Sequence, residues 1–168
     1  MIRRRTELHR SPVGDVGVED VVLPNGITTS LLVLRHPGAA AVLPLHTDGT
    51  VTLLHQHRHA AGGTLIEIPA GKLDDQEDPL ECARRELAEE AGLEGELRLL
   101  TRIHPAPAFA DEVISIYLAE HLRPVPSAHE ADEVITVMRV PLAEAIQWAR
   151  NGRITDAKTL VALLLIAR

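Results

Sequence analysis

The chain has 168 residues, of which 45% are hydrophobic and 24% charged, as in one ordinary globular domain. Its net charge of -7 argues against general binding to nucleic acid, which requires a basic surface. Cys82 is the single cysteine and the longest apolar run, residues 160–167, is too short to cross a bilayer, so we expect a soluble, cytoplasmic protein with no nucleic-acid or membrane partner.

Apolar or alternating stretches in the first part of the chain are predicted as β-strands. Asn25-Gly26 favours a hairpin between the first two, and the segment with Asp48 and Gly49 favours a second hairpin between the next two. The predicted strands are residues 18–23, 27–34, 39–45, 51–56 and 64–68.

The clearest helix is predicted to begin after Asp78. Asp78 can cap it, Pro79 suits the first helical position, and Glu81 completes a capping-box arrangement. Gly92 favours an end after Ala91. The apolar side chains at helical spacing, which should face the core, are Leu80, Ala83 and Leu87.

Beyond this helix the pattern predicts further strands, a Pro-rich loop and two more helices. The strands are residues 96–103, 113–119 and 134–140, the loop is 104–111, and the helices are 141–150 and a last one capped by Thr155 or Asp156 and running through Ile166. Strands mixed with a few helices, without strict alternation, predict a single α/β domain, residues 1–168, with a mixed sheet between helices.

The first chemical signal lies on the central helix. Glu86 and Glu90 are four residues apart, so both carboxylates leave the same helix face one turn apart. Two such carboxylates repel unless a cation binds between them, and Mg2+ commonly takes carboxylates together with water and substrate phosphate. A solvated acidic helix face is the alternative for any isolated pair of this kind.

The surroundings of this pair favour a metal site. Residues 71–93 read GKLDDQEDPLECARRELAEEAGL, with Gly71, Glu77, Arg85-Glu86-Leu87, Glu89-Glu90 and Gly92-Leu93 at fixed spacing. This segment resembles the Nudix box at every defined position. The chain is therefore identified as a member of the Nudix hydrolase family, in which the resemblance implies an α/β/α sandwich with a mixed sheet, here extended by an N-terminal antiparallel hairpin.

The resemblance also implies a chemistry and a set of roles. It predicts hydrolysis of the phosphoanhydride in a nucleoside diphosphate linked to another group, with Mg2+ as cofactor and Mn2+ as a substitute. Glu86 and Glu90 would be the main metal ligands, with Glu89 and the carbonyl of Ala70 as further ligands, and Arg85 would orient the glutamates. Glu77 would support the loop through hydrogen bonds.

The flanks of the box resemble the ADP-ribose pyrophosphatase group. Arg58, two positions after Gln56, is expected to contact the substrate diphosphate. Pro107 and Phe109 fall in the loop where that group contacts substrate, and Glu112 aligns with a glutamate that serves as base or positions water. Ala106 and Ala108 depart from the Ser and Gly usual in this loop.

These features predict cleavage of ADP-ribose to AMP and ribose 5-phosphate. They also predict a homodimer, because that group commonly dimerises through N-terminal strands, here residues 1–36. Two alternatives stay open. One is a Nudix hydrolase for another nucleotide sugar or dinucleotide, such as GDP-mannose or a flavin or nicotinamide dinucleotide. The other is a binding module that senses a nucleotide without hydrolysing it.

Several other residues carry two interpretations each. His55, His57 and His59 alternate and could hold zinc, although edge-strand side chains or substrate contacts are favoured. Cys82 is either a reactive thiol or a small buried filler, and Trp148 is either a stacking platform or a packing residue. Glu67 either binds the metal or supports the site from behind, with a hydrogen bond to backbone as the alternative. Glu130, Asp132 and Glu133 are favoured as a solvated loop, with a place near the site as the alternative.

Overall fold

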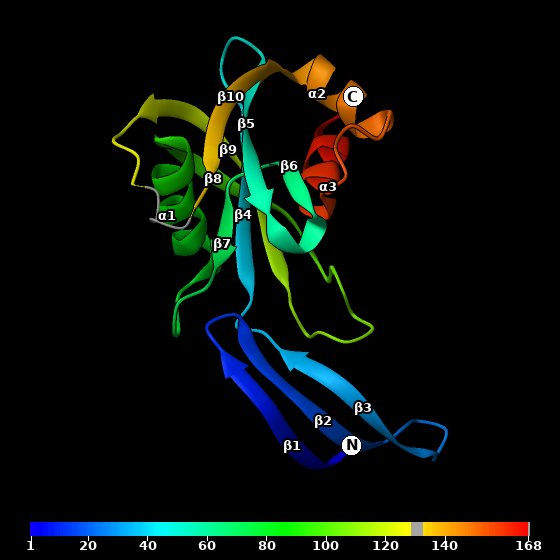
Figure 1. Ribbon diagram of the computed structural model, residues 1–168. Coiled ribbons are helices and arrows are strands. Elements are labelled where there is room, and N and C mark those ends of the chain that lie inside the picture. The colour runs from blue at the N-terminus through cyan, green and yellow to red at the C-terminus, as the bar shows by residue number, and fades with distance from the viewer. Residues whose placement is uncertain (129–132, 168) are drawn as a thin grey trace.

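The computed structural model describes residues 1–128 and 133–167. Strands β1 (Ile2–Ser11), β2 (Gly14–Val22) and β3 (Thr28–Arg35) form an antiparallel sheet that projects from the rest of the molecule (Figure 1). The hairpin predicted around Asn25-Gly26 is confirmed by the pairing of β2 with β3. Strand β1 is an addition to that hairpin. Its side chains are almost all exposed, so it lacks the apolar alternation that reveals a strand.

Two further sheets form the body of the molecule. One is mixed and has the order β7-β4-β9-β8, with β4 parallel to β9, and the other has the order β10-β5-β6. Their strands are β4 (Ala39–Pro44), β5 (Thr50–Arg58), β6 (Gly63–Glu67), β7 (Ala70–Lys72), β8 (Leu93–Ile103), β9 (Ile114–Pro124) and β10 (Ile135–Pro141), and a short 3-10 turn, η1 (His59–Ala61), joins β5 to β6.

The second predicted hairpin is wrong. Strands β4 and β5 belong to different sheets and share only an isolated bridge between Leu45 and Val51, although the turn between them does form. Strand β4 is buried throughout and β5 is buried from Val51 to Leu54, so the segments next to the turn carry no alternation that could indicate which neighbour each strand pairs with.

Strand β4 divides the interior into two cores. Ala40 and Val42 pack toward helix α1 (Pro79–Ala91), whereas Ala41 and Leu43 pack toward the second sheet and helices α2 (Leu142–Arg150) and α3 (Ala157–Ile166). The mixed sheet therefore lies between α1 on one side and the second sheet with α2 and α3 on the other (Figure 1). This layering confirms the predicted α/β sandwich.

Helix α1 has the ends that its sequence predicts. The carboxylate of Asp78 accepts a hydrogen bond of 2.8 Å from the N–H of Leu80, and Pro79 occupies the first turn. Gly92 adopts a left-handed conformation with φ of 63° and bonds the last carbonyls of the helix. These caps fix the start and end of the helix and hence the places of its glutamates.

Helix α3 is capped by Asp156, the second of the two predicted candidates. Its carboxylate accepts hydrogen bonds from the N–H and the hydroxyl of Thr159 at 3.0 and 2.6 Å. The Thr159 hydroxyl also accepts from the N–H of Ile68 at 2.9 Å, which ties the helix start to the end of β6.

Within the described ranges no helix combines the length and the apolar character that a membrane crossing requires.

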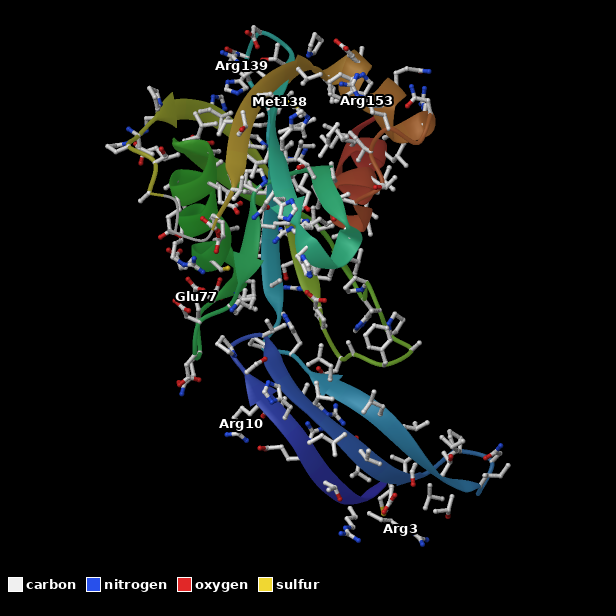
Figure 2. The ribbon with its side chains drawn as sticks, in the orientation of Figure 1. Arg3, Arg10, Glu77, Met138, Arg139 and Arg153 are labelled. Atoms are coloured by element: carbon white, nitrogen blue, oxygen red, sulfur yellow. The ribbon has the colours of Figure 1, made fainter. Side chains whose placement is uncertain are left out.

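The N-terminal sheet is fastened to the body near the end of β3. The N–H of Leu34 bonds the carbonyl of Phe109, and Asp111 accepts from the Arg35 guanidinium at 3.0 Å and from the His36 N–H at 2.8 Å. Figure 2 shows Arg3 and Arg10 on this sheet, at the opposite end of the molecule from Arg139 and Arg153. Both faces of the projecting sheet remain largely uncovered.

Candidate active site

Gly71 and Glu86 meet where β7 passes the first turns of α1. A Cβ atom placed on Gly71 would lie 1.8 Å from the Glu86 carboxylate oxygen Oε1, which is far inside contact distance. Only glycine at this position lets the carboxylate occupy its place beside the loop. The glycine that opens the box thus has a specific physical basis.

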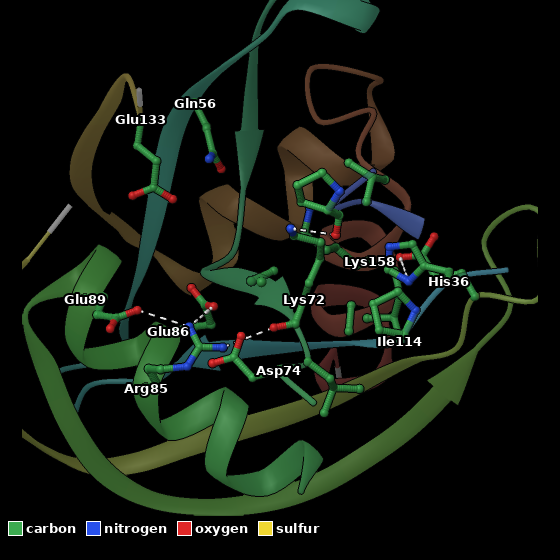
Figure 3. Close-up of a pocket in the computed structure, with 18 of the residues that line it drawn as sticks. His36, Gln56, Lys72, Asp74, Arg85, Glu86, Glu89, Ile114, Glu133 and Lys158 are labelled. Atoms are coloured by element: carbon green, nitrogen blue, oxygen red, sulfur yellow. Dashed lines mark hydrogen bonds and ion pairs between the residues drawn. The ribbon is translucent and has the colours of Figure 1, made fainter. Parts of the chain in front are cut away.

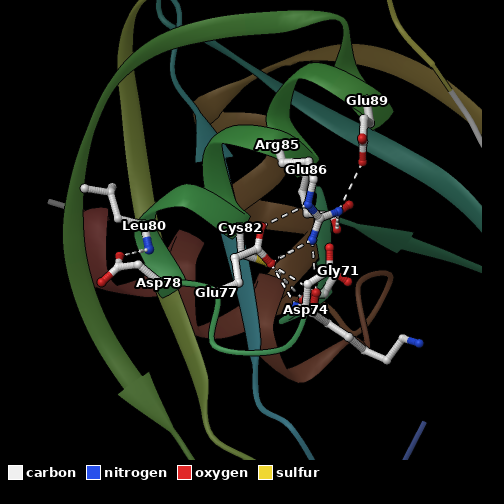
Figure 4. Close-up of polar contacts among 10 residues, drawn as sticks. Gly71, Asp74, Glu77, Asp78, Leu80, Cys82, Arg85, Glu86 and Glu89 are labelled. Atoms are coloured by element: carbon white, nitrogen blue, oxygen red, sulfur yellow. Dashed lines mark hydrogen bonds and ion pairs between the residues drawn. The ribbon is translucent and has the colours of Figure 1, made fainter. Parts of the chain in front are cut away.

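Arg85 gathers the acidic side chains of the box (Figure 4). Its Nη1 donates to Glu86 at 2.6 Å and to Glu89 at 3.1 Å, and Nε and Nη2 each donate to Glu77 at 3.1 Å. Nη2 also bonds the carbonyl of Lys72. One guanidinium thereby holds the helix and the preceding loop in register.

Glu77 performs the supporting role predicted for it. Besides its two bonds from Arg85, its carboxylate accepts from the N–H of Asp74 at 3.0 Å, while its own N–H donates to the Asp74 carbonyl. The Arg85 hydrogen bonds hold the pKa of Glu77 below its ordinary value. The carboxylate is therefore ionised and braces the loop that leads into α1.

Glu86 and Glu90 are unusually buried for carboxylates, with exposed fractions of 6% and 1%. Glu90 accepts a hydrogen bond of 2.8 Å from the N–H of Ala70, which stabilises its charged form. Even so, burial raises the pKa of Glu90 to about 8, and burial also raises the pKa of Glu86. Such desolvated acids stay ionised when a cation binds beside them.

The donor chemistry of this cluster fits a hard divalent cation. Glu86, Glu89 and Glu90 offer only oxygen ligands, and Ala70 adjoins them through its bond to Glu90. Within residues 1–128 and 133–167, however, no three ligating side chains are already gathered into a ready metal cluster, and Arg85 bridges Glu86 and Glu89. The residues suit the cation by their chemistry and burial.

A cleft of about 790 Å³ opens over these residues (Figure 3). It brings together side chains from the box, the second sheet, the segment before β9, helix α3 and the turn between β1 and β2. The polar residues that line it and concern the chemistry are Gln56, Arg58, Arg85, Glu86, Glu89, Glu112, Glu133 and Lys158. Such a concave, charged site suits a small anionic ligand accompanied by a cation.

Arg58 lines the cleft, as its predicted contact with a diphosphate requires. The buried carboxylate of Glu67 holds its guanidinium in place. Its Nε and Nη2 donate to the two carboxylate oxygens of Glu67 at 2.9 and 2.8 Å. Glu67 is 1% exposed and also accepts from Lys158. Glu67 therefore supports a residue of the cleft from behind, which is one of the roles that its sequence position offered, and it bonds two cations instead of backbone.

Lys158 is one of the cleft residues that the sequence did not reveal, as are His36, Lys72, Asp74 and Asp75. It is the one charged side chain of α3, among otherwise apolar residues, and it follows the cap Asp156 by two positions. That isolated charge is a weak signal, because its partner Glu67 lies 91 residues away in the chain.

Of the three residues predicted to contact substrate or water in or beside the Pro-rich loop, one lines the cleft and two do not. Glu112 lines the cleft, and its carboxylate lies 3.9 Å from Nδ1 of His36. Pro107 and Phe109 are not part of the lining, and Phe109 is 55% exposed beside the N-terminal sheet. The structure therefore brings Glu112 to the box and leaves the two loop residues outside the cleft of a single chain.

The remaining candidates divide in the same way. Glu133 lines the cleft, whereas Glu130 and Asp132 lie outside the described residues.

Cys82 is fully buried, and burial raises the pKa of its thiol to about 12. This confirms the interpretation of Cys82 as a buried filler and not as a reactive thiol. Trp148 packs against the core, and the guanidinium carbon of Arg153 lies over its ring, 3.7 Å from the ring centre.

The alternating histidines His55, His57 and His59 are exposed. They belong to no group of three ligating residues in the described part of the chain, so the zinc alternative gains no support. His55 instead borders a shallower hollow with residues of β6 and the α2–α3 connection.

Comparison with known proteins agrees with this geometry. Residues 34–163 match the family model of the NUDIX domain. The chain is 38% identical over 162 residues to the ADP-ribose pyrophosphatase of Bacillus subtilis (strain 168), covering 95% of this chain and 88% of that protein. It is 40% identical over 149 residues to the methanol dehydrogenase activator of Bacillus methanolicus, covering 87% and 80%.

Among solved structures, the crystal structure of an ADP compounds hydrolase superposes with a TM-score of 0.83 at 24% identity, covering 99% of this chain and 91% of that one. This likeness confirms the fold. The matched family model spans both cores and all of the cleft except Pro12 and Val13, and the Bacillus subtilis relative extends over nearly the whole chain. The chain therefore belongs to the Nudix hydrolase family.

Proposed function

We propose that the protein hydrolyses the diphosphate of ADP-ribose to AMP and ribose 5-phosphate, with Mg2+ as the cofactor and Mn2+ as a substitute. The observation that carries this proposal is the cleft that joins the box carboxylates to Arg58 and Glu112. The similarity to an ADP-ribose pyrophosphatase over 95% of the chain supports the choice of substrate.

The cation has an assigned place in this proposal. Glu86 and Glu90 would hold it, with Glu89 and the Ala70 carbonyl as further ligands. When bound, it neutralises charge on the diphosphate and makes water more acidic. Because Mg2+ prefers oxygen ligands and keeps several waters, two buried carboxylates and a neighbouring carbonyl are a suitable set.

The protein's own residues bind, orient and accept a proton. Arg58 would donate hydrogen bonds to the diphosphate from the wall of the cleft opposite the box. Glu112 would take the proton of the attacking water as the new P–O bond forms and the bridging P–O bond breaks. Arg85 keeps the carboxylates of Glu86 and Glu89 in place through the bonds described above.

Two roles in the proposal concern the loop and the dimer. Pro107 and Phe109 would contact the substrate only if their loop closes or if a second subunit brings a cleft to them. We further propose that the protein is a homodimer joined through the N-terminal sheet, residues 1–36. The uncovered faces of that sheet support this assembly.

A substrate panel tests the proposal. Phosphate-bond cleavage would be measured with Mg2+ for ADP-ribose, GDP-mannose, a flavin dinucleotide and a nicotinamide dinucleotide, and the products separated by chromatography. We expect the highest kcat/KM for ADP-ribose. A preference for another compound in the panel would move the substrate and keep the chemistry, whereas tight binding without turnover of any compound would make the protein a nucleotide sensor.

A further inference from the structure

A chain of four charged side chains runs from helix α3 to the cleft. Asp156 accepts from Lys158 at 3.0 Å, Lys158 donates to Oε2 of Glu67 at 2.5 Å, and Glu67 accepts from Arg58 through both oxygens. Only Arg58 is substantially open at this end, with 40% of its side chain exposed against 1% for Glu67 and 10% for Lys158.

Burial of the Lys158 ammonium group at this position costs free energy of folding. Its side chain is buried, and it stands in the first turn of α3, where the helix dipole disfavours a positive charge. The helix start would be satisfied by Asp156 and Thr159 without it. A residue that breaks local preferences in this way is expected where function requires it.

The charge count shows what Lys158 supplies. Arg58 and Lys158 carry two positive charges against the two negative charges of Glu67 and Asp156, so the four side chains together are neutral. Without Lys158 the two carboxylates would outnumber Arg58 by one, and the excess negative charge beneath the cleft would oppose an anionic ligand. Although burial raises the pKa of Glu67, the bonds from Arg58 and Lys158 outweigh that effect and hold the pKa below its ordinary value.

The geometry of Arg58 adds orientation to charge. Glu67 engages Nε and Nη2 as a planar fork, which fixes the guanidinium plane and leaves Nη1 for an acceptor in the cleft. Arg58 lines the same cleft as Glu86 and Glu89, and its ion pair with Glu67 connects it to Lys158 at the start of α3.

We infer that Lys158 is a positioning residue for the substrate diphosphate: through Glu67 it holds Arg58 toward the cleft, and its charge offsets the second carboxylate beneath the cleft. This inference rests on the proposed hydrolysis of a nucleoside diphosphate derivative, and it extends the site to helix α3. Arg58 binds the diphosphate before and during the reaction alike. Lys158 therefore acts mainly on KM and little on kcat.

A double-mutant cycle tests this inference. KM and kcat would be measured with Mg2+ for Lys158→Met, Glu67→Gln and the double variant, on ADP-ribose or on whichever compound of the panel has the highest kcat/KM. We expect Lys158→Met to raise KM about tenfold or more, as for a lost charge-assisted hydrogen bond, with kcat changed less than about threefold. In the Glu67→Gln background the same change should be nearly silent.

Two further variants separate positioning from folding. Thr159→Val removes the hydroxyl that ties α3 to Ile68, so it should lower Tm while KM stays near that of the wild type. Lys158→Gln keeps a hydrogen-bond donor and serves if the methionine variant does not fold. It should raise KM as well, because it lacks the charge.

The outcomes are distinct. Equal increases of KM by Lys158→Met in both backgrounds, or a fall in Tm with an unchanged KM, would overturn the role of Lys158 and leave the proposed function standing. A wild-type enzyme that cleaves another compound but not ADP-ribose would overturn the substrate and leave the cycle to be read on that compound. Absence of turnover on every compound would overturn both.

Discussion

Gly71 and Glu86 compete for the same space, since a Cβ on Gly71 would lie 1.8 Å from Oε1 of Glu86. The atoms that would clash belong to the far end of a flexible side chain and not to the backbone. The carboxylate can therefore swing away at little cost to the fold, but it then leaves the position in which Arg85 holds it. Glycine at residue 71 therefore matters more for the geometry of the site than for the stability of the fold.

Gly71→Ala should consequently reduce kcat/KM about 100-fold or more with a small change in Tm, because displacing a reacting group by about an ångström has effects of this size. Gly63→Ala is a matched control. Gly63 also begins a strand, but an added Cβ there meets no atom within 4 Å. Steady-state kinetics and thermal unfolding of both variants check the prediction, and near-normal activity of Gly71→Ala would contradict it.

Glu112→Gln should lower kcat and kcat/KM together, by about 10² to 10⁴-fold, as for loss of a general base. Glu133→Gln is the informative comparison, because Glu133 lines the same cleft. Kinetics of both variants on ADP-ribose decide between them. A loss below about threefold in kcat for Glu112→Gln would assign the base elsewhere, with Glu89 and Glu133 as the next candidates.

The N-terminal sheet should be the dimer interface. Leu31 and Leu32 are neighbours on β3 and point to opposite faces, yet their exposed fractions are 43% and 56%, so neither face is covered within one chain. We expect a mass of twice 18.3 kDa by light scattering at micromolar concentration.

Leu32→Asp should shift this mass toward the monomer, whereas Leu165→Asp, at an equally exposed leucine of α3, should not. A monomeric wild-type protein, or a dimer unaffected by Leu32→Asp, would count against this interface.

Acid should weaken the N-terminal sheet through Glu19. This carboxylate is 2% exposed and receives hydrogen bonds from Arg35 and Arg5, of which the Arg35 bonds contribute most to holding its pKa below the ordinary 4.5. The stabilisation is complete above the unfolded-state pKa and is lost as pH falls through the lower, folded-state pKa.

Thermal unfolding between pH 6 and pH 2.5 should therefore show wild type more stable than Glu19→Gln at the upper end, with the difference shrinking on acidification. A difference that is constant over this range would show that Glu19 acts by packing and not by charge. Asp20→Asn, which removes an exposed carboxylate from the next position of the same strand, is the matched control.

Local signals in the sequence predicted most of the fold. Asn25-Gly26, Asp78 and Gly92 each specify a turn or cap from their immediate neighbours, and the structure has all three. Strand pairing could not be predicted in this way. The partners of β4 are β7 and, far along the chain, β9, and the exposed strand β1 has no periodic apolar residues.

The box similarly predicted that Glu86 and Glu90 lie on one helix face, and the structure buries both of them there. The other wall of the cleft depends on contacts between distant segments. Glu67 and Lys158 are 91 residues apart, and only the docking of α3 against the end of β6 brings them together beneath Arg58. No pattern within either segment indicates that pairing.

The most direct measurement is product analysis of ADP-ribose incubated with Mg2+ and the wild-type protein, Glu86→Gln or Glu90→Gln. We predict AMP and ribose 5-phosphate in equal amounts from the wild type and none once the metal is chelated. Each variant should lose about 100- to 1,000-fold in kcat with its fold retained, as for loss of several kcal/mol of transition-state stabilisation. Glu81→Gln, at an exposed position of the same helix, should remain active. Near-normal kcat in Glu86→Gln or Glu90→Gln at saturating Mg2+ would contradict the metal site, and no cleavage of ADP-ribose by the wild type would contradict the substrate.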